Sequence, residues 1–185
     1  MKVMIFANND IGLYKFRKEL IEELVKDNDV YMCLPDGEYI KDLKILGANF
    51  IPCDLLDRHG TNPIKELKLI GWYKSILKKY KPDIVFTYTI KPNVYAGMAC
   101  ASLNVPYVAN VTGLGTAVEN PGLMQFATVN LYKYGLRKAQ KVFFQNTENR
   151  DFMLSKGAVK GAYDMLPGSG VNLSNYTVSE YPNDD

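Results

Sequence analysis

Polar side chains and glycines gather in four short segments, each directly after a run of apolar residues. The segments are residues 8–12, 88–93, 110–122 and 146–148. Their amides and hydroxyls can bind a polar ligand by hydrogen bonds, and Lys91 can neutralise a phosphate, with Lys15 and Arg17 as further candidate cations. Gly12, at the start of a predicted helix, can offer backbone N–H groups to an anion, and a simple tight turn explains it equally well.

Other chemistries have little support. His59 is the only histidine and lies in a turn-rich stretch, which favours a solvated loop residue over a catalytic base. The three cysteines, Cys33, Cys53 and Cys100, are widely spaced and indicate reduced thiols near a core rather than a disulfide framework or a zinc site. No carboxylate cluster suggests a metal. The first segment contains one glycine, so it matches neither G-x-G-x-x-G nor a P-loop, and nicotinamide binding is not expected.

The composition is that of one ordinary globular domain. Of the 185 residues, 47% are hydrophobic, and 22 basic against 20 acidic residues leave a net charge of +2. That balance argues against nucleic acid as a partner. No apolar run approaches the ~20 residues of a membrane-spanning helix, and the N-terminus lacks the apolar stretch of a signal peptide. We therefore expect a cytoplasmic protein.

Strands and helices are predicted to alternate along the chain. The expected strands cover residues 2–7, 29–34, 49–52, 83–88, 105–111, 141–145 and 163–166. The expected helices cover residues 13–26, 39–46, 63–80, 92–103, 123–140 and 148–156. This rhythm predicts an α/β fold, with a Rossmann-like, doubly wound and mostly parallel sheet and helices on both faces. Ligands of such sheets bind beyond the carboxyl ends of the strands, where the polar segments would meet.

Three segments resemble a known family. They are Asn8-Asn9-Asp10-Ile11-Gly12-Leu13-Tyr14-Lys15-Phe16-Arg17, Phe86-Thr87-Tyr88-Thr89-Ile90-Lys91-Pro92-Asn93, and residues 104–115, NVPYVANVTGLG. Together they resemble the N-terminal half of a bacterial family-four glycosyltransferase with the GT-B fold, from the branch that assembles capsule, exopolysaccharide or lipid-linked oligosaccharide. The resemblance covers residues 1–173 and includes Gly-Ser-Gly-Val-Asn at 168–172, where the family crosses into its second domain.

The resemblance implies a domain organisation. Residues 1–173 would form the acceptor-side domain, and residues 174–185 a tail or a shortened interdomain linker. The C-terminal, donor-binding domain is not in this sequence. The full enzyme would transfer a hexose or N-acetylhexosamine from a nucleotide sugar, a UDP-sugar, to a lipid-linked or polysaccharide acceptor. Retention at the anomeric carbon, and no cofactor or metal, are also what the resemblance implies. We expect the isolated chain to be inactive.

The resemblance also points to substrate-binding residues. Sugars are held by neutral amides, hydroxyls and aromatic faces, and a lipid pyrophosphate by a cation. The expected substrate-binding residues are Asn9, Gly12, Tyr88, Lys91, Asn93, Asn110, Thr112 and Gly113. Simpler interpretations are a solvated loop lysine for Lys91 and a core aromatic for Tyr88. Relatives place histidines where this chain has Thr112 and Thr87-Tyr88-Thr89, so the catalytic residues are unknown.

One predicted helix suggests contact with the inner face of a cell membrane. On residues 63–80, Trp72 falls outside the apolar stripe, in a sector shared with Lys65, Lys68 and Lys79. A tryptophan among lysines suits an anionic lipid surface, although Trp72 packed on a neighbouring loop beside a solvated lysine face is the simpler alternative. For the whole chain, the rival function is a non-catalytic sugar- or nucleotide-binding α/β module.

Overall fold

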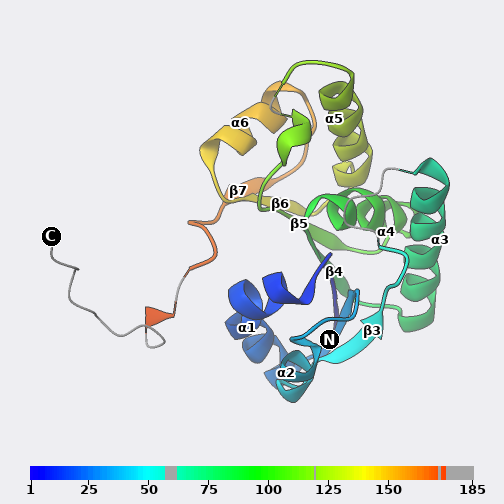
Figure 1. Cartoon of the computed structure of the whole chain (residues 1–185), viewed down its shortest axis with the longest axis vertical. Helices are drawn as coiled ribbons and strands as arrows, with labels where there is room; N and C mark the ends of the chain where they lie inside the picture. Colours follow the sequence, from blue (N-terminus) through cyan, green and yellow to red (C-terminus); the bar gives the residue numbers. More distant parts are fainter. Residues whose placement is uncertain (57–61, 119, 171, 174–185) are drawn as a thin grey trace, which may run out of the picture.

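A seven-stranded sheet, in which every neighbouring pair is parallel, forms the centre of the molecule (Figure 1). The computed structural model describes residues 1–56, 62–118, 120–170 and 172–173. The strand order is β3-β2-β1-β4-β5-β6-β7. The strands are β1 (Lys2–Phe6), β2 (Asp29–Leu34), β3 (Asn49–Pro52), β4 (Ile84–Tyr88), β5 (Tyr107–Val111), β6 (Lys141–Phe144) and β7 (Tyr163–Met165). The predicted Rossmann-like α/β architecture is confirmed.

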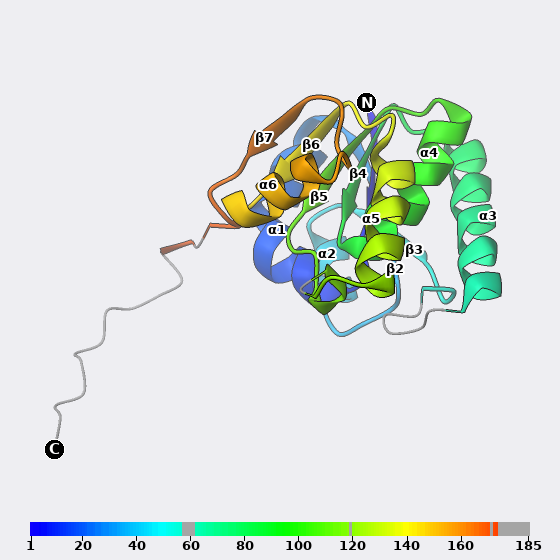
Figure 2. The same ribbon diagram turned by 90° about the horizontal axis from the view of Figure 1, so that it is seen from above.

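Helices cover both faces of the sheet (Figure 2). They are α1 (Asp10–Asp27), α2 (Ile40–Ile45), α3 (Pro63–Tyr80), α4 (Gly97–Leu103), α5 (Leu123–Leu136) and α6 (Thr147–Ser155), with a π-helical turn η1 (Pro92–Ala96) and a 3-10 turn η2 (Thr116–Val118). Alternate residues of β1 face opposite ways: Val3 and Ile5 pack with α1 and α2, and Met4 and Phe6 pack with α3 and α4. A third cluster joins β5 and β6 to α5 and α6.

Two helices differ from the sequence prediction at their first turns. Helix α1 begins at Asp10 rather than residue 13, because the Asn9 side chain accepts a hydrogen bond from the Gly12 N–H at 2.6 Å and caps the helix. The helix predicted over 92–103 starts as the π-helix η1 and becomes α-helical at Gly97. π-Helical turns are rare and frequently lie at functional sites.

Two glycines let η1 and α4 approach α5 backbone to backbone. A Cβ placed on Gly97 would lie 2.3 Å from the Gly135 carbonyl oxygen, and one on Gly135 would lie 2.6 Å from the Val94 Cα. The buried Tyr107 hydroxyl donates a hydrogen bond to the same Gly135 carbonyl at 2.7 Å. These contacts leave no room for a side chain, so they fix how closely the π-helical turn packs on α5.

Two predictions concern residues outside the described ranges. They are the solvated His59, in the stretch 57–61, and the tail or linker at 174–185. Within the described residues, no helix is long and apolar enough to span a bilayer.

Candidate crevice at the carboxyl edge of the sheet

A crevice of about 350 Å³ lies where four strands end and α1 begins. The backbone after β1 and the first two turns of α1 form one wall, and the ends of β4, β5 and β6 form the other. Parallel strands bring their carboxyl ends to one edge, which explains why residues far apart in sequence meet here. The lining residues are Ala7, Asn8, Asn9, Gly12, Leu13, Phe16, Arg17, Tyr88, Thr89, Thr112, Gln145 and Ser169.

A second pocket of about 340 Å³ shares part of this lining. Phe16, Arg17, Tyr88 and Ser169 belong to both pockets, so the two form one continuous groove. The second pocket extends under α1 to the sheet residues Phe86, Asn110 and Phe143. Phe16 and Leu20, which the periodicity of α1 places in the core stripe, are instead 53% and 38% exposed, and they line this second pocket.

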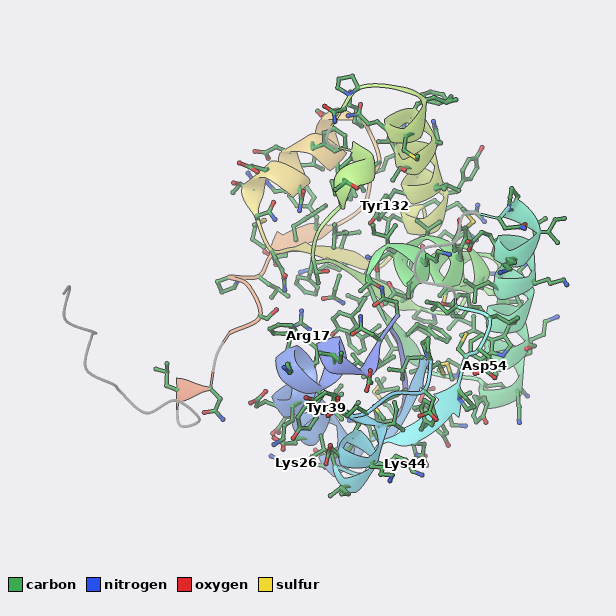
Figure 3. The ribbon with its side chains drawn as sticks, in the orientation of Figure 1. Arg17, Lys26, Tyr39, Lys44, Asp54 and Tyr132 are labelled. Carbon is green, nitrogen blue, oxygen red and sulfur yellow. The ribbon has the colours of Figure 1, made fainter. Side chains whose placement is uncertain are left out.

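Arg17 is the cation that the structure places in the groove. Its guanidinium lies 5.0 Å from the centre of the Tyr88 ring, within the range of a cation–π interaction. Burial raises the pKa of the Tyr88 hydroxyl, and the neighbouring guanidinium opposes that shift. The hydroxyl is therefore a neutral hydrogen-bonding group at ordinary pH. Figure 3 shows Arg17 on α1, on the side toward β5 and β6.

Thr89, next along the chain, has a strained backbone. Its φ angle is +71°, a left-handed conformation that is unfavourable for a β-branched residue. The other non-glycine residues with positive φ, among those described, are Lys81 and Asn104, which end helices α3 and α4. Thr89 ends a strand instead and lines the crevice. Strain of this kind is often found at functional sites.

The structure brings five of the eight predicted substrate-binding residues together. Asn9, Gly12, Tyr88 and Thr112 line the first pocket, and Asn110 lines the second. Gly12 cannot present its own N–H to an anion, however, because Asn9 accepts that hydrogen bond. Lys91, Asn93 and Gly113 lie outside the lining of both pockets.

Lys91 was expected to bind a pyrophosphate or to be a solvated loop lysine, and in the structure its side chain is largely buried and lies outside the lining of both pockets. Its Nζ lies 2.6 Å from Oε1 of Glu66 on α3, and the two side chains are only 15% and 11% exposed. A buried carboxylate needs such a partner because an isolated charge is costly to desolvate. The ion pair therefore ties the segment after β4 to α3, and a role for Lys91 in acceptor binding stays a prediction.

Asn93 is also an internal residue, 1% exposed. Its Oδ1 accepts a hydrogen bond from the Thr87 hydroxyl at 2.7 Å, and its Nδ2 donates to the Asn110 carbonyl at 2.9 Å. Asn110 in turn donates from Nδ2 to the Thr87 carbonyl at 3.3 Å. Asn93 thus links η1 to β4 and β5, and both ends of its amide are already engaged within the fold.

Sequence reasoning missed several lining residues. Phe16, Thr89, Gln145 and Ser169 line the crevice but were not among the predicted binding residues. Ser169 lies in the Gly-Ser-Gly stretch, and its Oγ accepts a hydrogen bond from Gln145 Nε2 at 3.2 Å. Gln145 is the last residue of the predicted strand 141–145, and a polar side chain at the carboxyl end of a strand was the signal that could have identified it.

The predicted membrane-facing sector of α3 is only partly exposed. Lys65, Lys68 and Lys79 are exposed, but Trp72 is half-buried. The indole packs against the α3–α4 core, edge-on to the Tyr73 ring at 5.4 Å between centroids. Trp72 thus packs on the core of its own side of the sheet rather than on a neighbouring loop, and membrane contact by this sector stays a prediction.

The lining groups are suited to binding. In the first pocket, amides, hydroxyls, aromatic faces and one guanidinium can hold a sugar and a phosphate through hydrogen bonds and charge. The second pocket adds the carboxylate of Glu19. Among the described residues, no group of three or more His, Cys, Asp or Glu side chains is placed to hold a metal ion. Cys33, Cys53 and Cys100 are buried, reduced thiols in the α3–α4 core.

The sequence and the fold were compared with known proteins. The model of a family described as glycosyl transferase 4-like matches residues 2–146. A comparison with curated protein sequences gives no match.

Solved structures with the same fold include enzymes that handle nucleotide sugars. A glycosyltransferase from Rickettsia africae has a TM-score of 0.67 at 17% identity, covering 94% of this chain and 44% of its own. Anabaena Alr3699/HepE in complex with UDP and glucose has a TM-score of 0.69 at 15% identity, covering 97% and 47%. UDP-GlcNAc 2-epimerase from Neisseria meningitidis, bound to UDP-GlcNAc, has a TM-score of 0.60 at 17% identity, covering 85% and 44%. The chain thus spans less than half the length of these proteins.

Proposed function

Because this chain belongs to the glycosyl transferase 4-like family, we propose that it forms the acceptor-binding half of a nucleotide-sugar-dependent glycosyltransferase with the GT-B fold. Residues 1–173 form the acceptor-side domain, and the groove beside Arg17 and Tyr88 holds the acceptor. The observation that carries this proposal is the lining of the first pocket, where the guanidinium of Arg17 lies among amides, hydroxyls and aromatic rings. The carboxylate of Glu19 lines the second pocket.

The chemistry of the groove favours an acceptor in which a sugar is joined to a phosphate. Amides and hydroxyls match sugar hydroxyl groups, and a planar guanidinium matches the oxygens of a phosphate. The acceptor is therefore a lipid-linked or growing cell-surface saccharide. Transfer of a hexose or N-acetylhexosamine proceeds with retention and requires no metal, and the enzyme works at the cytoplasmic side of the membrane.

The solved structures support a UDP-sugar as the donor. Anabaena HepE is described in complex with UDP and glucose, and the Neisseria epimerase bound to UDP-GlcNAc. Each of these chains is about twice as long as this one, which supports a second half that completes the donor site. The 185-residue chain alone should therefore show no transfer from UDP-, GDP- or dTDP-sugars. Measurable turnover by this chain would contradict the division into two halves.

Binding of a soluble acceptor analogue tests the role of Arg17. The probe is a short prenyl diphosphate carrying one N-acetylhexosamine, and the measurement is titration calorimetry. Arg17→Gln should weaken binding by roughly tenfold to a hundredfold, because a charged hydrogen bond typically contributes ~1.5–3 kcal/mol. Lys15→Gln, on the exposed side of the same helix, is the matched control and should leave the affinity unchanged.

Two results would refute the acceptor assignment. Equal affinities of Arg17→Gln and the parent chain for the diphosphate probe would remove Arg17 from the acceptor site. If Arg17→Gln weakened the binding of UDP instead, the groove would belong to the donor. If the chain binds sugars but adding a donor-binding half produces no glycosyl transfer, the non-catalytic sugar-binding module would be favoured.

A further inference from the structure

The loop between β2 and α2 contains an aspartate followed by a glycine. Asp36-Gly37 is the only Asp-Gly pair in the sequence, and the sequence has no Asn-Gly pair. Both residues are exposed, so water reaches them freely. Because glycine has no Cβ, its amide nitrogen is open to approach by the carboxyl group of the residue before it. The pair therefore meets the steric requirement for isomerisation of the backbone at an aspartate.

The geometry of the loop brings the two reacting groups together. The Gly37 N–H donates a hydrogen bond to Oδ1 of Asp36 at 2.9 Å, and among the described residues it has no backbone acceptor. The nitrogen thus faces the carboxyl group, and no helix or sheet hydrogen bond has to break before it reaches the Cγ atom. The exposed pair Asp54-Leu55 differs, because leucine carries a branched side chain beside its amide.

The fold requires glycine at position 37. A Cβ there would lie 2.4 Å from Cγ and from both carboxylate oxygens of Asp10. Asp10 is the first residue of α1 and is 6% exposed, and its Oδ2 accepts a hydrogen bond from the Tyr39 N–H at 2.7 Å. The Tyr39 ring, labelled between α1 and α2 in Figure 3, stacks on Tyr14 at 4.7 Å between centroids. The Asp10 carboxylate thus occupies the place of the side chain that would shield the Gly37 amide.

We propose that Asp36 is a site of spontaneous modification, at which the folded chain converts aspartate to isoaspartate. The Gly37 nitrogen attacks Cγ of Asp36 and forms a C–N bond. The hydroxyl of the neutral carboxyl group and the amide proton leave together as one water, and a succinimide ring results. Water then adds to the main-chain carbonyl carbon of Asp36 and breaks its bond to the Gly37 nitrogen. The main chain now runs through the former side chain, and the product has the mass of the starting protein.

The modification acts on the contact between this loop and α1. It lengthens the main chain by one methylene group directly before Gly37, which lies against the Asp10 carboxylate. The added atom displaces the loop and breaks the hydrogen bond from Tyr39 to Asp10. The first turn of α1, whose capping residue Asn9 lines the crevice, thereby loses a contact that holds it. The proposal stands whether or not the crevice binds a saccharide.

Ageing of the native chain tests the site. The chain would be kept at physiological temperature and neutral pH for several weeks, and peptide mapping with electron-transfer fragmentation would distinguish isoaspartate from aspartate. Isoaspartate should accumulate at position 36 and not at Asp54, which is the internal control. Asp36→Glu is the matched variant and should stay unmodified, because glutamate would have to close a larger and less favourable ring.

Hydrogen exchange and thermal melting test the structural consequence. In the aged parent chain the Tyr39 amide should lose its protection. The fraction that contains isoaspartate should melt roughly 3–12 °C lower, because a hydrogen bond to a charged group is lost. The aged Asp36→Glu chain should keep the protection and the melting temperature of the fresh protein. Fresh Asp10→Ala should lose protection at Tyr39 without any modification.

Three results would overturn the proposal. Absence of isoaspartate at position 36 in the native chain would refute the site, and its appearance only in the urea-unfolded chain would show that the fold protects the pair. Equal conversion at Asp54 would show that neither Gly37 nor the loop geometry directs the reaction. An isomerised chain with the parent melting temperature and a protected Tyr39 amide would refute the effect on α1.

Discussion

Replacing Lys91 by Met should destabilise the fold far more than a loop substitution would. Its ammonium group lies 2.6 Å from the Glu66 carboxylate, and the two side chains are 15% and 11% exposed. Removing one partner of a buried ion pair typically costs 3–5 kcal/mol, because the other charge stays desolvated and uncompensated. The residual exposure places this pair near the lower end, at about 3 kcal/mol. For a domain of this size, that loss corresponds to a fall in melting temperature of roughly 6–12 °C.

A double-mutant cycle separates the pair from its surroundings. Urea unfolding would be followed by circular dichroism for the parent, Lys91→Met, Glu66→Leu and the double variant. The double variant should recover most of the loss, because two apolar side chains can replace a buried pair. Lys68→Met, exposed on α3, is the matched control and should change the unfolding free energy by less than ~0.5 kcal/mol. A loss below ~0.5 kcal/mol for Lys91→Met, with additive effects in the cycle, would refute a buried and coupled pair.

Two further predictions follow from the interior. Gly135→Ala should lower the unfolding free energy by at least ~2 kcal/mol in a denaturation curve, because its Cβ would lie 2.6 Å from the Val94 Cα. The control, Gly71→Ala on the open surface of α3, should instead raise the unfolding free energy by up to ~1 kcal/mol. Equal effects of the two substitutions would refute the close approach of Gly135 to η1. Burial raises the pKa of the Cys53 thiol from 9.0 to about 11 and that of Cys100 to about 12, so the folded protein should resist a thiol reagent at pH 8 and react once unfolded. Because the pKa values of these thiols are higher in the folded state, their contribution to the stability of the fold is complete below about pH 9 and is lost as the pH rises through 11. Rapid labelling of the native chain at pH 8 would contradict the burial of the thiols.

Much of the sheet could be predicted because its signals are local. The apolar run after Lys2 fits a strand buried on both faces, and Pro63 and Pro82 bracket α3, which has the predicted bounds of residues 63–80. The edge at which the polar segments meet follows from parallel pairing. Tyr88, Thr112 and Asn110 could therefore be placed near one crevice before any coordinates were known.

The fate of Lys91 could not be predicted from its own segment, because its partner lies 25 residues away on another element. One signal was present: the apolar stripe of Leu69 and Tyr73 on α3, continued back one turn, meets Glu66. A carboxylate on a buried stripe requires a cation, and the sequence does not say which lysine supplies it. The exposure of Phe16 had no local signal, since the helical period alone assigns it to the core stripe.

The strand order has a consequence for folding during synthesis. β1, β2 and β3 lie next to one another and are complete at Pro52, whereas the other neighbour of β1 is β4, which begins at Ile84. During translation at roughly 5–20 residues per second, one edge of β1 therefore stays unpaired for seconds after the first three strands have left the ribosome. Its sequence there is Val3-Met4-Ile5-Phe6, an apolar segment of the kind that aggregates when exposed. A nascent chain paused before Ile84 should be a preferred client of ribosome-bound chaperones, and one that has passed Tyr88 should be released.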